Sequence, residues 1–96
     1  MIVEWHPRAP KRLRQIYEYI EEHNPHAAED IFRQVSEAVM TLAESPRLYR
    51  LGRIEGTREM IVHPNYLVVY SVTDRVTVLN VLHTRRRFPL DEGFEC

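Results

Sequence analysis

The stretch from residue 56 to residue 89 places the tightest limits on what this chain can fold into. It holds three short runs rich in β-branched and aromatic residues, at positions 56–62, 66–72 and 76–83. Only three turn-forming residues separate one run from the next, and connections this short join antiparallel neighbours. The stretch therefore predicts a three-stranded antiparallel meander.

The second run is expected at the centre of the sheet. Residues 66–72 are apolar on both faces except at Ser71, as in a strand that is covered on both sides. The third run keeps polar side chains on both faces, at Thr77, Asn80 and His83. We therefore expect this last strand to be less completely covered than the middle one.

Upstream of the meander, a first amphipathic helix follows a short strand expected at residues 2–5. Pro7 and Pro10 suit the first turn of a helix, whose backbone N–H groups lack partners in any case. The helix is expected to begin between His6 and Ala9 and to end near residue 23. Its apolar stripe has the i, i+3, i+4, i+7 spacing and consists of Leu13, Ile16, Tyr17 and Ile20.

A second helix begins at Asn24-Pro25, an N-cap residue followed by proline at the first helical position. It is expected to stop before Ser45-Pro46. Its stripe consists of Ala28, Ile31, Val35, Ala38, Val39 and Leu42, with Phe32 at the edge. So short a link makes the helices antiparallel neighbours, and residues 46–56 remain as the longest irregular segment.

The predicted fold class is α+β: a short N-terminal strand, an antiparallel helical hairpin and a three-stranded antiparallel meander in one sheet packed by the helices. The chain has 96 residues, so residues 1–96 form a single domain in which residues 84–96 are a basic exit and an acidic tail. The one cysteine, Cys96, cannot form an internal disulfide. No apolar run approaches the roughly 20 residues of a membrane span, and no signal peptide is apparent, so the expected location is cytoplasmic.

Several short sequence motifs, in this order and spacing, resemble those of the RelE/ParE toxins of bacterial toxin–antitoxin pairs, most closely the ParE branch. The resemblance spans about residues 2–89. Its motifs are Pro7-Arg8-Ala9, Leu13, Ile16, Tyr19 and Ile20, Asn24-Pro25-His26-Ala27-Ala28, Leu42 to Ser45-Pro46, Gly56-Thr57-Arg58-Glu59, His63-Pro64-Asn65-Tyr66 with Tyr70, and Val81-Leu82-His83-Thr84-Arg85-Arg86 with Pro89. Two features depart from the pattern: Arg12 replaces an expected acidic residue, and the tail from Leu90 onward has no counterpart.

This resemblance implies a toxin that binds DNA gyrase and traps it on cleaved DNA, which is a binding role rather than an enzymatic one. It also implies a small, ParD-like antitoxin that forms a hetero-oligomer with the toxin, as its partly disordered segment wraps around it. Sheet edges and the outer groove of the helical hairpin are surfaces that can accept such a segment as a strand or a helix.

Relatives of the RelE type instead cut mRNA on the ribosome, and this alternative has its own candidate residues. Attack by a 2′-hydroxyl needs a base, an acid and cations near the phosphate, and His83, Arg58 and Glu59 form the candidate catalytic set. The lysines and terminal tyrosine of those relatives are missing, and the net charge of −1 is unlike that of an RNA-binding enzyme. Arg58 beside Glu59 also fits an ion-paired strand residue. A third alternative is a non-toxic subunit that only completes a repressor complex with its antitoxin.

The residues expected to bind a partner are cationic or lie beside the basic exit: Arg58, His83, Arg85, Arg86, Arg87 and Phe88. A guanidinium pairs through two hydrogen bonds with either a carboxylate or a phosphate, so this surface suits an acidic antitoxin segment or a complex of gyrase with DNA. No cofactor is expected. A metal site is also not expected, because His23 and His26 have no further ligands at a regular spacing.

Overall fold

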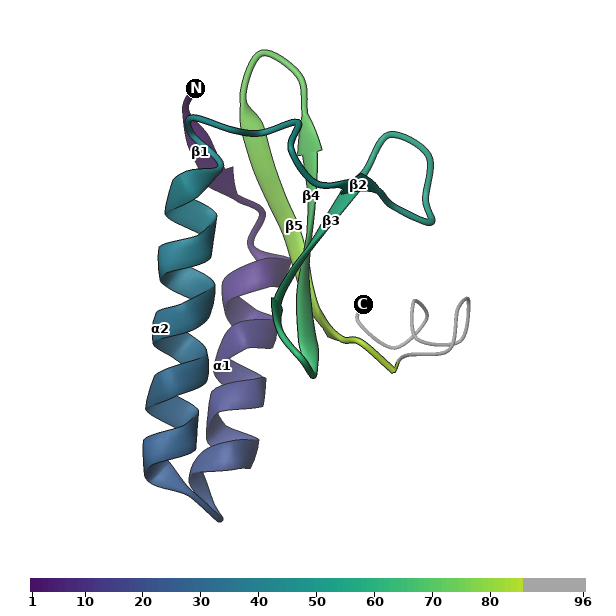
Figure 1. Cartoon of the computed structure of the whole chain (residues 1–96). Coiled ribbons are helices and arrows are strands. Elements are labelled where there is room, and N and C mark those ends of the chain that lie inside the picture. Colours follow the sequence, from purple (N-terminus) through teal and green to yellow (C-terminus); the bar gives the residue numbers. More distant parts are fainter. Residues whose placement is uncertain (86–96) are drawn as a thin grey trace.

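The computed structural model describes residues 1–85 and consists of two helices packed on one face of a five-stranded sheet (Figure 1). The strands lie in the order β1-β5-β4-β3-β2, and β1 pairs with β5 in parallel while all other pairs are antiparallel. The elements are β1 (Val3–Trp5), α1 (Arg8–Glu21), α2 (Pro25–Thr41), β2 (Arg50–Leu51), β3 (Arg58–His63), β4 (Tyr66–Val72) and β5 (Val76–His83). The predicted α+β class, helical hairpin and meander are confirmed.

The helical hairpin forms where the sequence predicts it, and its local signals are satisfied. The Asn24 side chain accepts a hydrogen bond from the Ala27 backbone N–H (3.1 Å), and Pro25 occupies the first position of α2. Both apolar stripes face the sheet. The core consists of Ala9 and Leu13 of α1, Ile31, Val35, Val39 and Leu42 on the α2 side, and Met60, Val68, Tyr70, Val76, Val78 and Val81 of the sheet. None of the helices within residues 1–85 is long and apolar enough to cross a membrane.

The middle strand of the meander is buried on both faces, as predicted. Val68 and Tyr70 of β4 face the helices, whereas Leu67 and Val69 belong to a second, smaller apolar cluster with Leu82 on the opposite face. Since adjacent strand residues point to opposite faces, this alternation assigns each cross-strand neighbour to one face or the other.

Two expectations about the strands need correction. Part of the segment predicted to be irregular, Arg50–Leu51, pairs with β3 as strand β2. The strand β5 is not less covered than β4: it lies between β4 and β1, and even Asn80 is buried. The sequence pattern could not reveal this, because the parallel pairing of β1 with β5 joins segments more than 70 residues apart.

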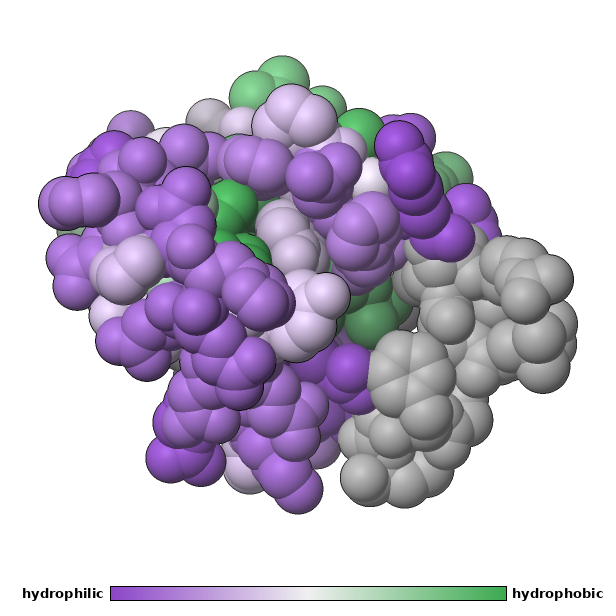
Figure 2. Space-filling model, turned by 90° about the horizontal axis from the view of Figure 1, so that it is seen from below, coloured by the Kyte–Doolittle hydropathy of each residue, from purple (hydrophilic) through white to green (hydrophobic). Residues whose placement is uncertain are grey.

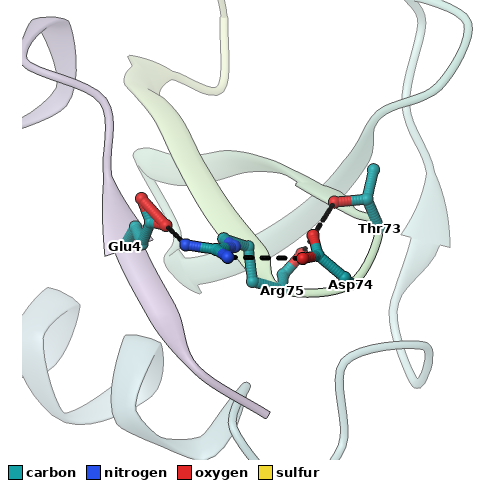
Figure 3. A network of polar contacts seen from close by, with 4 residues as sticks. All are labelled: Glu4, Thr73, Asp74 and Arg75. Atoms are coloured by element: carbon teal, nitrogen blue, oxygen red, sulfur yellow. Dashed lines mark hydrogen bonds and ion pairs between the residues drawn. The ribbon is translucent and has the colours of Figure 1, made fainter.

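A charged network joins the edge strand β1 to the turn between β4 and β5 (Figure 3). The Arg75 guanidinium contacts Glu4 on β1 and also Asp74 (3.3 Å), whose carboxylate accepts a further hydrogen bond from Thr73 Oγ1 (3.1 Å). The hydrogen bonds from Arg75 and Thr73 lower the pKa of Asp74. The network therefore links the N-terminal strand β1 to the turn between β4 and β5.

Removal of a core side chain at the end of α2 tests the packing of the hairpin on the sheet. We expect Leu42→Ala to lower the free energy of unfolding by about 2–5 kcal/mol, because the Leu42 side chain is fully buried and the change leaves a cavity. Met40→Ala is the matched control, since Met40 is 74% exposed and lies one half-turn away. Equal denaturation midpoints in urea for the two variants would contradict the described packing.

Candidate functional site

His83 stands at the end of β5 in a row of three rings that crosses the sheet. The pairing places His63 of β3 and His83 of β5 on either side of Tyr66 of β4. Their ring centroids lie 5.9 Å and 5.3 Å from that of Tyr66, and the row lies on the helix-facing side of the sheet. Burial, and then the nearby Tyr19 of α1, raise the pKa of the Tyr66 hydroxyl. His83 thus packs edge-on against a neutral phenol at the exposed end of the sheet.

Backbone hydrogen bonds decide which nitrogen of each histidine faces outward. The Arg85 N–H donates to His83 Nδ1 (3.0 Å), and the Asn65 N–H donates to His63 Nδ1 (3.0 Å). A neutral imidazole that accepts at Nδ1 carries its proton on Nε2, so the outer nitrogen of His83 is a donor. This arrangement suits a contact with a carboxylate or phosphate better than removal of a proton by His83.

The exit from β5 is tied to the turn between β3 and β4. The Thr84 N–H donates to the Asn65 carbonyl (2.9 Å), and Thr84 Oγ1 donates to the Pro64 carbonyl (2.9 Å). Arg85 is exposed immediately after this junction. The basic exit therefore starts from a fixed point, whereas Arg86, Arg87 and Phe88 lie outside the described residues.

The structure does not bring Arg58 together with His83. Arg58 pairs with Tyr70 and His83 pairs with Tyr66, so their rows are four residues apart along β4, roughly 13 Å at about 3.3 Å per residue. The Arg58 guanidinium instead donates to the carbonyls of Tyr49 (2.7 Å) and Arg47 (3.4 Å). In this position it holds the segment before β2 against the sheet.

Glu59 lies on the opposite face from His83, and its ion-pair partner is Arg50 rather than the adjacent Arg58. Its pairing with Val69 places it with the smaller apolar cluster, where it is only 4% exposed. One carboxylate oxygen accepts from Arg50 Nη2 (3.0 Å) and the other from the Arg53 N–H (3.3 Å). The candidate catalytic set of His83, Arg58 and Glu59 is therefore spread over two faces and two ends of the sheet.

The outer side of the helical hairpin carries a groove of about 570 Å³ between α1 and α2. Tyr17 packs edge-on against Phe32 (6.3 Å between centroids), and the Tyr17 hydroxyl donates to Glu29 (3.2 Å). The lining residues are Pro10, Leu13, Arg14, Tyr17, Glu29, Phe32 and Arg33. Phe32 is half exposed although it is a large apolar side chain, which marks this groove as a surface suited to a partner.

Seen from the end at which the two helices are joined, the molecule is mostly hydrophilic, with an apolar hollow near the middle of this view (Figure 2). Within residues 1–85, no group of three or more His, Cys, Asp or Glu side chains could hold a metal ion.

Sequence reasoning missed the segment from Pro46 to Thr57 as a structured surface. The buried Tyr70 donates its hydroxyl hydrogen to the Pro46 carbonyl (2.7 Å), in addition to the contacts made by Arg58 and Glu59. The regular spacing of Arg47, Arg50 and Arg53 was the only visible signal. It did not show that three side chains of the meander reach back to hold this segment.

Comparison with known proteins gives consistent matches over most of the chain. The family described as the ParE toxin of type II toxin–antitoxin system, parDE, matches residues 3–88. The protein Y4kP of Sinorhizobium fredii is 36% identical over 88 residues, which cover 91% of this chain and 92% of that protein. The toxin RelE2 of Caulobacter vibrioides is 34% identical over 85 residues, which cover 88% of this chain and 96% of that protein.

Two solved structures share the fold. The chromosomal ParDE TA system from P. aeruginosa includes a chain with a TM-score of 0.78 at 18% identity, covering 86% of this chain and 95% of that one. The conserved protein HP0894 from Helicobacter pylori matches with a TM-score of 0.52 at 17% identity, covering 88% and 94%. At such low identity these two structures are similar to this chain in fold alone.

The hydroxyl of Tyr70 provides a test of how the 46–57 segment is held. Burial raises the pKa of this hydroxyl, and the positive charge of Arg58 opposes the increase only in part. The folded chain therefore retains this proton at a pH where the unfolded chain has lost it. The contribution of Tyr70 to stability is complete below about pH 10 and is lost as the pH rises toward the folded pKa.

We expect Tyr70→Phe to cost about 0.5–1.5 kcal/mol at pH 7, since the bond to the Pro46 carbonyl is lost while the ring remains. Above pH 10, the free energy of unfolding should fall less steeply for the variant than for the wild type. Urea denaturation across this pH range measures both effects, and Tyr19→Phe, at an exposed tyrosine, is the control. Parallel pH profiles for Tyr70→Phe and the wild type would refute the assignment.

Proposed function

Because the chain belongs to the ParE toxin family of type II toxin–antitoxin systems, we propose that it is a toxin that binds DNA gyrase and holds it on cleaved DNA, in the cytoplasm. The observation that favours this role over RNA cleavage is the dispersal of the candidate catalytic residues. His83 and Arg58 lie about 13 Å apart along the sheet, and Glu59 lies on its other face. A binding role needs no such constellation.

Ribonuclease chemistry would require these groups to converge on one phosphate. The Glu59 carboxylate is hydrogen-bonded to Arg50 and to the Arg53 N–H, and the Arg58 guanidinium is hydrogen-bonded to two backbone carbonyls. The outer nitrogen of His83 carries a proton in the tautomer that the Arg85 N–H selects. These hydrogen bonds weaken the RelE-type alternative, whose remaining support is an exposed His83 beside Tyr66 and Arg85.

Neutralisation by an antitoxin is the second part of the proposal, and the groove of the helical hairpin is the proposed docking site. Its apolar lining, with Tyr17 and Phe32, fits the apolar face of an amphipathic helix. Arg14 and Arg33 line the same groove, with Arg33 in an exposed ion pair with Asp30 (3.1 Å), so acidic residues on that helix would meet guanidinium groups there. The antitoxin expected here is therefore a helical segment with apolar residues at i, i+3, i+4 and i+7 and carboxylates beside them.

Truncation of the half-exposed aromatic ring of this groove tests the docking site. Phe32→Ala should weaken binding of the cognate antitoxin about tenfold to a hundredfold, because large aromatic side chains at the centre of an interface contribute most of its binding energy. Met40→Ala changes an exposed apolar side chain on the same helix outside the groove lining, and should leave the dissociation constant within about twofold. Isothermal titration calorimetry measures both, and equal affinities for the two variants would remove the groove from the interface.

A gyrase cleavage assay tests the proposed target. Purified toxin, gyrase, ATP and supercoiled plasmid are incubated, and covalent complexes are trapped with detergent and protease. We expect linear DNA to increase with toxin dose and to disappear when antitoxin is added. His83→Gln should retain this activity, because the proposal gives His83 no part in proton transfer.

The outcomes separate the proposal from its rivals. Normal supercoiling without linear product, together with mRNA cleavage on ribosomes that His83→Gln abolishes, would establish the ribonuclease alternative. Absence of both activities, with operator binding only in complex with antitoxin, would establish the co-repressor alternative. In each case circular dichroism confirms that the protein used is folded.

A further inference from the structure

We propose that the segment from Pro46 to Thr57 is the surface that binds the target. The patch that it recognises is an apolar protein surface bordered by carboxylates, not DNA. We call this segment the arginine platform. The inference rests on the proposed function, since the target in question is gyrase. It assigns the contact to the protein part of the gyrase–DNA complex and to a surface distinct from the helical groove.

The platform exposes apolar side chains that a folded chain would normally cover. Leu48 is 70% exposed, Leu51 is 73% exposed, and Ile54 is also exposed, all within seven consecutive residues. Beside Leu51 lies a hollow of about 200 Å³, whose lining includes Val72, Arg47 and Arg58. A hollow of this size, apolar at Leu51 and Val72 and cationic at the two arginines, fits one apolar side chain with a carboxylate beside it.

Several hydrogen bonds from side chains of the sheet fix this exposed segment in place. The Tyr70 hydroxyl donates to the Pro46 carbonyl (2.7 Å), and the Arg58 guanidinium donates to the Tyr49 carbonyl (2.7 Å). The Glu59 carboxylate accepts from both the Arg50 side chain and the Arg53 N–H. All three anchoring residues belong to β3 and β4. A surface fixed before binding loses less conformational entropy when a partner docks, so this rigidity favours affinity.

Two glycines and a threonine close the segment on itself. The Gly52 N–H donates to the Thr57 carbonyl (2.8 Å), and Thr57 Oγ1 donates to the Ile54 carbonyl (2.6 Å). A Cβ atom at Gly52 would lie 2.3 Å from Thr57 Oγ1, and Gly56 has φ +85°, which side chains rarely allow. The loop between β2 and β3 therefore has a defined shape, and it projects away from the helical hairpin (Figure 1).

The side-chain types favour protein over nucleic acid as the partner. Proteins that grip single strands stack bases on aromatic rings, whereas the exposed apolar groups here are two leucines and one isoleucine. Tyr49, the one aromatic residue of the platform, packs against the core instead. Within residues 1–85, the side chains of Arg47 and Arg53 have no ion-pair partner, so two guanidinium groups are available for carboxylates of the target.

Binding of the toxin to gyrase protein in the absence of DNA tests the inference. Immobilised gyrase subunits are titrated with wild-type toxin, with the double variant Leu48→Ala/Leu51→Ala and with Arg47→Glu, by biolayer interferometry. Met40→Ala and Lys11→Glu are the matched controls, at an exposed apolar and an exposed cationic side chain of the helices. Urea denaturation of every variant establishes that it is folded.

We expect both platform variants to bind about tenfold to a hundredfold more weakly, with controls within about twofold of the wild type. Wild-type affinity in the platform variants, with gyrase cleavage intact, would overturn the inference and leave the proposed function standing. Binding that requires DNA would overturn it in favour of a nucleic-acid contact. A wild-type toxin that neither binds gyrase nor causes cleavage would refute the proposed function, and the platform assignment with it.

Discussion

The burial of the meander under the helical hairpin is the interaction on which the rest of the structure depends. Val68 and Tyr70 of β4 and Val78 of β5 meet the apolar stripes of both helices in one core. Burial of each such side chain stabilises the fold by roughly 1.5–3 kcal/mol, so in a chain of 96 residues this single layer supplies most of the favourable free energy. The proposed binding surfaces lie where that layer ends or on its outer sides.

The polar residues near the core are used to attach segments that lack a core of their own. Tyr70 illustrates this use: its ring is buried among apolar side chains, while its hydroxyl holds the Pro46 carbonyl. Glu59 illustrates the cost of such an arrangement, because a carboxylate that is 4% exposed is stable only with its charge paired and its oxygens hydrogen-bonded. Arg50 and the Arg53 N–H meet that requirement, and in doing so they order the platform.

The two proposed binding surfaces lie on separate parts of this small domain. The groove lies between α1 and α2, whereas the loop after β2 projects from the β2 edge of the sheet, away from the helices (Figure 1). A segment docked in the groove does not depend on the polar contacts that shape the platform. Under the proposed function, neutralisation and target recognition would therefore be altered by substitutions at different residues.

The sequence by itself determined the two helices, four of the five strands, their order along the chain and the family. The 3.6-residue stripes, the Asn24-Pro25 cap and the three β-branched runs are local signals, and each corresponds to an element in the structure. The motifs that resemble ParE toxins are also features of the sequence alone. The family that they indicate is the one that the comparison with known proteins shows.

Only the tertiary structure decided where the candidate functional residues lie. Arg58 and Glu59 are adjacent in sequence, yet strand alternation sends them to opposite faces, and their partners come from a segment that looked irregular. Likewise, β1 pairs with β5, although more than 70 residues separate them in the sequence, and no local pattern records this pairing. The physical reason is that period and capping act over a few residues, whereas the partner of a buried charge is chosen by packing across the whole domain.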